Sequence, residues 1–427
     1  MHDVVAHLER HSSTRSATPP GEALLDLVQR QTFGFFWELS HAESGMARDR
    51  ANETTGPDNT MVATGGTGFG VMAMIAAVER GWISRGEAVQ RLARILSFLE
   101  SADCYRGMFA HWYNGDTGEE FSFWQGNAGG DVAETAFLMV GLLSARQYFA
   151  DPQEPEAGLR RRIDRLWQRV EWDFFTDNED ALIWHWGHKH GWATRHKIVG
   201  WDECLIAYVL AASSPTYPIS PDAYHEGWTA GRTFINGKRY YDIKLPLGPD
   251  FGGPMFFSHY PFLGLDPRGL KDRYADYWEQ VRAHALINYE HCRRNPNNCK
   301  GYGGDCWGLT ASDGDTGYAA HQPILDTGVI APTAALASLP YTPEQSMRAL
   351  EHFYFEMGDR IWGKYGFYDA FNEGAGWVAR DYLAIDQGPI VIMIENYRTA
   401  LLWRLFMSCP EVQHGLDTLG FEPRPVA

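Results

Sequence analysis

The chain has 427 residues and a formal net charge of −17 at neutral pH. Such an acidic surface repels phosphate backbones and anionic lipids, so nucleic acid and membrane surfaces are excluded as partners. No apolar run approaches the roughly 20 residues of a membrane span. Aromatic residues make up 14% of the chain, including 16 Trp. Their apolar faces and polar edges suit sugar rings, although a large aromatic core is an alternative use.

No linker-like run interrupts the chain after residue 20, so we expect one domain over residues 21–427 behind a frayed, polar segment 1–20. The N-terminus has no apolar h-region, which predicts a cytoplasmic protein as written, or a periplasmic one if a leader was removed. The six cysteines lack zinc-type spacing. Cys299 and Cys306 flank a Gly-rich loop and are candidates for pairing, while free thiols are the default.

The first third of the chain predicts three helices. Helical spacing covers residues 22–39 and 88–99. The glycines that follow Gly65 resemble a weak dinucleotide fingerprint, but no strand precedes them and no ribose-binding acid follows. We therefore interpret them as a tight entry into a helix.

An aromatic loop then leads to a pair of acids. Asp131 stands at a predicted helix start, and Glu134 follows three residues later, which is close to a capping box. This spacing also places both carboxylates on one face of the helix. Asp131 is expected to cap the helix, and that role does not exclude contact with a ligand.

Residues 181–203 are rich in Trp and His and end at Glu203, which opens another apolar helix. A metal site is one interpretation of these histidines, but no ligand set stands at fixed helical spacing. We favour aromatic and imidazole side chains that line a sugar cleft. No metal and no cofactor are expected.

The second half predicts a small β-ribbon between Gly237 and Gly248 and a helix over 273–294. A long irregular segment, 296–333, is typical of a functional loop. Helices are predicted at 331–339 and 343–358.

The stretch 382–403 joins a turn, Ile385 to Pro389, to a run that is apolar on every side. Such a run is a central strand or a buried helix, and the residues after it favour a helix that continues through Phe406. Asp386 then lies just ahead of a helix N-terminus, where it is a helix cap or a functional acid.

Ten to twelve helices separated by Gly- and aromatic-rich loops predict an all-α fold, an α/α toroid with long loops and the small β-ribbon at its cleft. A doubly wound α/β fold is the alternative, but the strands that it needs are missing. If the helices share one orientation, four acids meet at the cleft: Asp131, Glu134, Glu203 and Asp386. Two carboxyls with stacking aromatics are the requirements of glycoside hydrolysis.

Several blocks, among them TGGTGFGVMAMIAAVERG, GGDVAETAFLMVGLL, GWDECLIAYVLAASSPTYPI, WGLTASDGDTGYAAH and YLAIDQGPIVIMIENYRTALLW, resemble the bacterial glucoamylase-like domain. More narrowly, they resemble glycoside hydrolase family 144, the β-1,2-glucanases, over about residues 25–422. The resemblance implies an (α/α)6 barrel that hydrolyses β-1,2-glucan with inversion. Inverting enzymes hold their two carboxyls roughly 6.5–9.5 Å apart, with a water between them.

The resemblance also implies catalytic and substrate-binding roles for individual residues. Glu203 in GWDECL matches the general acid and Asp386 in AIDQGP the general base, while Asp131 and Glu134 match acidic cleft residues. The candidate stacking residues are Trp112, Trp124, Trp184, Trp186, Trp307 and Trp377. Further candidates for substrate contact are His185, Trp201, His259, Tyr260, His321, Tyr368 and Asn372.

Two departures from relatives fall near the cleft. Asn127 stands where some relatives are expected to carry an acid, and GHKHGW replaces a shorter polar loop. These departures leave open which substrate length the chain prefers and whether its action is endo or exo. The alternatives are an exo-acting sophorohydrolase, a transglycosylase or phosphorylase on the same fold, and a catalytically silent sugar-binding module. A monomer is expected, with an oligo- or polysaccharide as its partner.

Overall fold

The computed structural model describes residues 20–52, 60–123 and 128–422. The expected frayed segment 1–20 lies almost wholly outside these residues, as do Trp124 and Asn127. The described chain is mainly helical, and its strands are two or three residues long. The strands pair into small sheets of two or three strands, none of which is closed. No helix in the described ranges combines the length and the hydropathy that a bilayer crossing requires.

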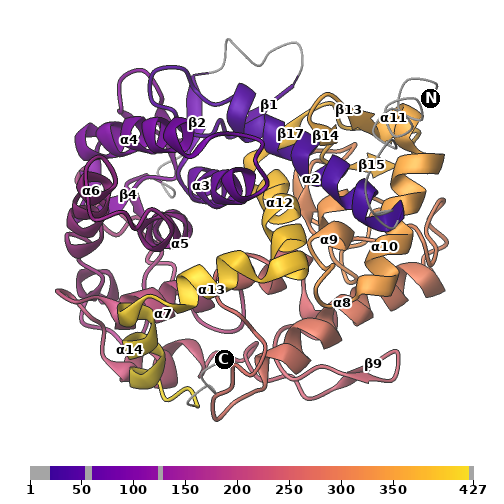
Figure 1. The fold of residues 1–427 in the computed structure, drawn as a ribbon. Helices are drawn as coiled ribbons and strands as arrows, with labels where there is room; N and C mark the ends of the chain where they lie inside the picture. Colours follow the sequence, from indigo (N-terminus) through magenta and orange to yellow (C-terminus); the bar gives the residue numbers. More distant parts are fainter. Residues whose placement is uncertain (1–19, 53–59, 124–127, 423–427) are drawn as a thin grey trace.

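Three long helices, α3 (Thr64–Glu79), α5 (Val132–Tyr148) and α12 (Ala384–Thr399), form the centre of the molecule (Figure 1). Helix α3 packs against both α5 and α12. Their sequences are apolar on nearly every side, and most of their residues are buried. Shorter buried helices are α7 (Leu205–Ser213), which packs on α5, and α9 (Pro332–Leu336), which packs on α12.

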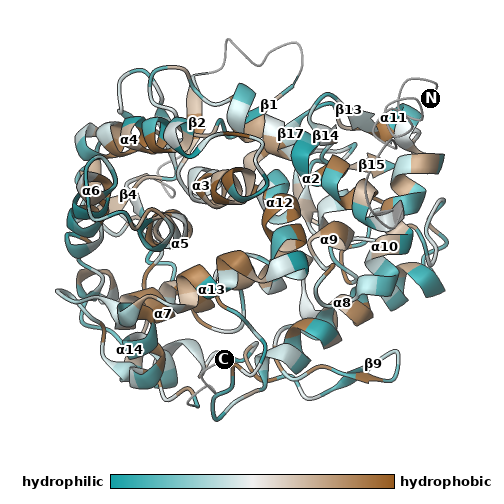
Figure 2. Cartoon of the chain, in the orientation of Figure 1, coloured by the Kyte–Doolittle hydropathy of each residue, from teal (hydrophilic) through white to brown (hydrophobic). Residues whose placement is uncertain are grey.

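Amphipathic helices cover this centre, as Figure 2 shows for α4 and α10 with their mixed teal and brown faces. They bury one apolar stripe and expose the opposite face. The covering helices are α2 (Pro20–Glu38), α4 (Arg85–Ser101), α6 (Glu156–Gln168), α8 (Tyr277–Arg294), α10 (Pro343–Glu351) and α14 (Pro410–Thr418). The predictions of helices near 22–39, 88–99 and 273–294 are thus confirmed within a few residues at each end.

Helix α12 lies between two hydrophobic cores. Val391, Ile392 and Met393 belong to the larger core, whereas Ile390 and Ile394 belong to the second. The predicted turn at 385–389 is wrong, because these residues already form the first turns of the helix and Pro389 lies inside it. The predicted continuation through Phe406 is interrupted at Ala400, whose left-handed backbone (φ 57°) separates α12 from α13 (Leu401–Met407).

A short strand immediately precedes each central helix. β2 (Met61–Ala63) runs into α3, β7 (Gly130–Asp131) into α5, and β17 (Tyr382–Leu383) into α12. β2 pairs with β5 (Trp112–Asn114), which pairs with β6 (Glu120–Phe121). β7 pairs with β8 (His185–Trp186), and β17 with β1 (Arg50–Ala51). These pairings hold the residues before each helix in fixed positions at that end of the molecule.

Glycines permit the close approach of α3 and α5. A Cβ on Gly68 would lie 2.2 Å from the Phe137 carbonyl oxygen, and one on Gly141 would lie 2.2 Å from the Gly68 carbonyl oxygen. Because real Cβ atoms do not tolerate such distances, both positions require glycine for this packing.

Two smaller predictions need correction. The β-ribbon exists as β9 (Arg239–Tyr240) and β10 (Ile243–Lys244), but it packs beside α8 and does not line the cleft described below. The helix predicted at 343–358 ends as α10 at Glu351 and continues as a π-helical turn, His352–Glu356. All six cysteines are free, so Cys299 and Cys306 do not pair.

Candidate active site

A cavity of about 670 Å³ lies where the central helices begin. Its wall includes Gly66 of α3, Glu134 of α5 and Ile385 of α12. Its other lining residues are Asp49, Arg50, Met61, Ala63, His111, Trp112, Phe123, Asp131, Ala133, Phe137, Trp184, His185, Glu203, Phe256, Tyr260, Ala311, Tyr318 and Leu383. Helix N-termini present free backbone N–H groups, so this end of the helices favours negative charge.

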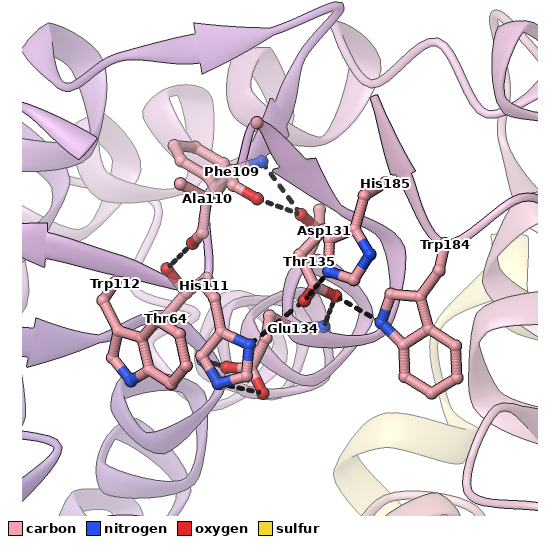
Figure 3. A network of polar contacts seen from close by, with 12 residues as sticks. Thr64, Phe109, Ala110, His111, Trp112, Asp131, Glu134, Thr135, Trp184 and His185 are labelled. Carbon is pink, nitrogen blue, oxygen red and sulfur yellow. Dashed lines mark hydrogen bonds and ion pairs between the residues drawn. The ribbon is translucent and has the colours of Figure 1, made fainter. Parts of the chain in front are cut away.

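Asp131 is the best-anchored acid of the cavity. It caps α5, and its Oδ1 accepts from the Glu134 backbone N–H (3.0 Å) and from Trp184 Nε1 (3.1 Å). Its Oδ2 lies 2.9 Å from His185 Nε2 and 3.1 Å from His111 Nδ1 (Figure 3). Burial opposes its ionisation, but the charge of His185 and the hydrogen bonds of both histidines outweigh burial and lower the pKa of Asp131. Asp131 is therefore an ionised acceptor held by side chains from three segments.

Glu134 lies one turn further along α5. Its Oε2 accepts from the Gly65 backbone N–H at 2.7 Å, and His111 Nε2 lies 3.5 Å from its Oε1. The predicted capping box is thus only half formed, because Glu134 bonds across to α3 instead of back to Asp131. Burial, together with the nearby charge of Asp131, raises the pKa of Glu134 to about 7. His111 lies between the two acids in Figure 3, and although burial opposes it, their charges raise its pKa to about 9.

Glu203 reaches the cavity from the loop that precedes α7, whose N-cap is Cys204. Its side chain is half-buried in the cavity wall. Burial, and then the negative charge of Asp202, raises the pKa of Glu203 well above its ordinary value. The nearby charges of Asp131 and Glu134 act in the same direction. Glu203 is therefore a carboxyl in the cavity wall whose surroundings favour its protonated form.

Asp386 lies in the first turn of α12 and is 3% exposed. It is not among the lining residues, although its neighbour Ile385 is. Asp386 and Glu203 both act electrostatically on the buried hydroxyl of Tyr260, which lines the cavity. The two acids named as general acid and general base thus approach the same tyrosine, Glu203 in the cavity wall and Asp386 behind it.

A second polar group borders the cavity beside α12. Asp49 accepts from Trp112 Nε1 at 2.8 Å, which fixes the indole at the cavity wall. Arg50 bonds to Asp313 (3.2 Å) and to Asp381 (3.4 Å). Sequence reasoning missed Asp49 and Arg50, because they follow a loop that carries no helical or strand pattern. It also missed Phe123 and Tyr318, two exposed rings at the cavity.

Of the predicted stacking residues, Trp112 and Trp184 line the cavity. Trp186 does not line it and packs on Phe174 and Trp192. Trp201 and Trp307 are at most 2% exposed inside the cores, so their faces are closed to a sugar and we do not retain them as binding residues. Apolar faces inside a helical core are also where such indoles gain most from burial.

The remaining candidates are divided between the cavity and its surroundings. His185 and Tyr260 line the cavity. His259 bonds to Ser338 at 2.9 Å inside the core, where burial lowers its pKa to about 3, and we do not retain it as a contact residue. Four candidates do not line the cavity: His321, Tyr368, Asn372 and Trp377. His321 contacts Thr327, and Asn372 bonds to Asp315. Tyr368 packs on Tyr382, and Trp377 packs beside Ala370.

Known proteins with similar sequence and structure place the chain in a family. The family model Glycoamylase, described as "Putative glucoamylase", matches residues 195–410. The solved endo-β-1,2-glucanase of Chitinophaga pinensis, in complex with sophorotriose and glucose, is 50% identical and superposes with a TM-score of 0.92. That alignment covers 95% of this chain and 99% of the other. The chain belongs to this glucoamylase-like family.

Two further comparisons define the glucoamylase-like chain more closely. The exo β-1,2-glucooligosaccharide sophorohydrolase of Parabacteroides distasonis is 44% identical over 98% of this chain. The chain spans only 61% of the length of that relative. A fungal endo-β-1,2-glucanase of Talaromyces funiculosus is 12% identical with a TM-score of 0.68, covers 92% of this chain and 90% of its own, and shows shared fold alone. The resemblance to the glucoamylase-like domain and to glycoside hydrolase family 144 is thus confirmed.

Proposed function

We propose that this protein is a glycoside hydrolase that cleaves β-1,2-glucosidic linkages in β-1,2-glucan, with inversion, on an (α/α)6 barrel. The observation that carries the proposal is the position of Glu203, a half-buried carboxyl in the wall of an acidic cavity, where burial favours its protonated form. The β-1,2 linkage is inferred from the names of two relatives, an endo-β-1,2-glucanase and a β-1,2-glucooligosaccharide sophorohydrolase. The packing of α3, α5, α7, α9 and α12 inside a cover of amphipathic helices supports the barrel.

Glu203 is the proposed general acid. It donates its proton to the glycosidic oxygen, directly or through a substrate hydroxyl, as the bond between the anomeric carbon and that oxygen breaks. Asp386 is the proposed general base. It takes a proton from the water whose oxygen bonds to the anomeric carbon from the opposite face, so the product has the inverted configuration.

Asp131 and Glu134 are proposed to hold the sugar. Asp131 is ionised and only accepts hydrogen bonds, so a glucosyl hydroxyl would donate to it beside, or in place of, His111 or His185. Trp112 and Trp184 are the proposed stacking residues, since both indoles line the cavity and both N–H groups are bonded to acids.

An exo-acting sophorohydrolase is the second candidate, favoured by the name of the Parabacteroides relative. Endo action yields a ladder of oligosaccharides from a long chain. Exo action yields one disaccharide from the first turnovers onward.

The test is incubation of the purified chain with linear β-1,2-glucan, linear β-1,3-glucan and starch, with and without phosphate. Products are followed by chromatography, and their anomeric configuration by proton NMR during the first minutes. We expect turnover of the β-1,2-polymer alone, without need for phosphate, and the anomer opposite to the substrate linkage. Turnover of starch only would overturn the linkage, phosphate dependence would identify a phosphorylase, and retention would overturn the roles of the two acids.

A further inference from the structure

Two buried aspartates lie together beneath the cavity wall. Asp369 is 2% exposed and Asp386 is 3% exposed. Asp369 Oδ1 and Asp386 Oδ2 are buried and receive no hydrogen bond from any other described residue. A buried carboxylate oxygen without a donor is costly, so this arrangement requires an explanation.

The two carboxyl groups lie within hydrogen-bonding reach of each other. Two ionised carboxylates only accept hydrogen bonds and repel one another, whereas a protonated one can donate to its neighbour. The other oxygen of Asp369 is occupied, because it accepts from the Asp313 backbone N–H at 2.7 Å. A proton between the two side chains satisfies both open oxygens at once.

Among the charged groups around the pair, the cation of Arg50 opposes the rise in both pKa values that burial causes. Arg50 is directed to Asp313 and Asp381, which together with Asp49 leave this corner of the cavity negative. The hydroxyls of Tyr260 and Tyr318 also lie near the pair, and burial, followed by the charge of Asp386, raises their pKa values and keeps them neutral. Every titratable group that faces the pair thus either repels a second negative charge or is uncharged, except Arg50.

We propose that Asp369 and Asp386 hold one proton between them, and that Asp369 is a positioning residue that makes Asp386 a base. This inference rests on the proposed function. The pair carries a single negative charge in the resting enzyme, with the Asp386 hydroxyl donating to Asp369. When water attacks the anomeric carbon, Asp386 passes its own proton to Asp369 and takes one from the water, so the pair becomes neutral. The Glu203 proton moves to the leaving oxygen as the bond between that oxygen and the anomeric carbon breaks. After release of the products, the pair returns one proton to solvent and Glu203 regains one.

The direction of the pKa shifts agrees with this assignment. Burial raises the pKa of Asp369 to about 7, and burial followed by the charge of Asp369 raises the pKa of Asp386 well above its ordinary value. The two titrations belong to the pair and not to either residue alone.

The test counts protonated aspartates by isotope-edited infrared spectroscopy of the full chain, labelled at the aspartate side-chain carboxyl, at about pH 7.5. The wild-type chain is expected to show a protonated-carboxyl band that disappears in both Asp369→Asn and Asp386→Asn, because either change removes the repulsion that retains the proton. Asp381→Asn is the control: its carboxyl bonds to Arg50 and Asn52, Asp369 bonds to its backbone carbonyl, which the substitution keeps, and the band should persist. Persistence of the band in Asp369→Asn would show that burial alone protonates Asp386 and would overturn the proposal.

A kinetic measurement tests the role in the reaction. Asp369→Asn is expected to lower kcat by about 10- to 100-fold with little change in KM, and to move the acidic limb of the pH profile. A raised KM together with an unchanged pH profile would contradict the positioning role. If the wild type does not hydrolyse β-1,2-glucan, the proposed function fails, whereas the infrared result still decides whether the proton is shared.

Discussion

The carboxyl groups of Asp131 and Glu134, three residues apart at the start of α5, have pKa values shifted in opposite directions. Asp131 receives hydrogen bonds from two imidazoles and one indole, so its ionised form is stabilised. Glu134 is equally buried but receives one backbone N–H and lies beside the charge of Asp131. The pKa values of the two acids therefore differ because of their environments and not because of their residue types, as they do in other paired-carboxylate sites.

Replacement of Glu134 by Gln is expected to flatten the dependence of stability on pH. The folded pKa of Glu134, about 7, lies above the ordinary glutamate value of 4.5, so the folded state binds the proton more tightly than the unfolded state does. Its contribution to stability is complete below about pH 4.5 and is lost as pH rises through 7, by about 3 kcal/mol. Chemical denaturation at several pH values measures this loss, and an equal slope in both proteins would contradict it.

Glu203→Gln is expected to lower kcat on β-1,2-glucan by about 10²- to 10⁴-fold, because the amide cannot donate the proton that the leaving oxygen needs. Binding of sophorotriose should persist, since the shape of the side chain is kept. Initial rates and calorimetric titration measure the two effects. Full activity in this variant would remove Glu203 from the mechanism.

The alkaline limb of kcat/KM is expected to lie well above the ordinary pKa of a glutamate. Glu203 acts while protonated, and burial raises its pKa, so activity is retained at neutral pH and is lost as pH rises through the raised value. A profile of kcat/KM against pH measures the limb. An alkaline limb near pH 4.5 would show that Glu203 is not protonated in the free enzyme.

Trp184 offers a matched pair of variants. Trp184→Phe keeps an aromatic face but removes the N–H that bonds to Asp131, at a cost of about 1.5–3 kcal/mol for a hydrogen bond to a charged group. Trp184→Ala also removes the face, so KM should rise further. Thermal unfolding reports the lost bond and steady-state kinetics the lost face. Equal KM values in the two variants would mean that the ring does not stack on sugar.

Gly68→Ala is expected to destabilise the fold by about 1–3 kcal/mol, because its Cβ would collide with the backbone of α5. Gly86→Ala is the control: Gly86 lies in α4, its Cβ would meet nothing within 4 Å, and it should stabilise the chain by up to about 1 kcal/mol. Thermal melts of both proteins measure the contrast. A neutral Gly68→Ala would show that the two helices can separate.

Much of this organisation was predictable from the sequence. The all-round apolar character of α3, α5 and α12 identifies central helices, and Asp131 was correctly placed as a helix cap. Trp201 and Trp307 were placed at the cleft because composition shows that a chain is rich in Trp but not which faces are covered. Asp369 was not identified because its importance depends on a contact with Asp386 and on burial, neither of which has a local signal.

The short strands before α3, α5 and α12 stand between the loops of the cavity rim and the central helices. We expect insertions or deletions on the outer side of these strands to leave the positions of the helices unchanged. Such a division allows a lineage to diversify the length of glucan that it accepts while its chemistry is inherited intact. Endo- and exo-acting relatives on one scaffold are the outcome that this architecture favours.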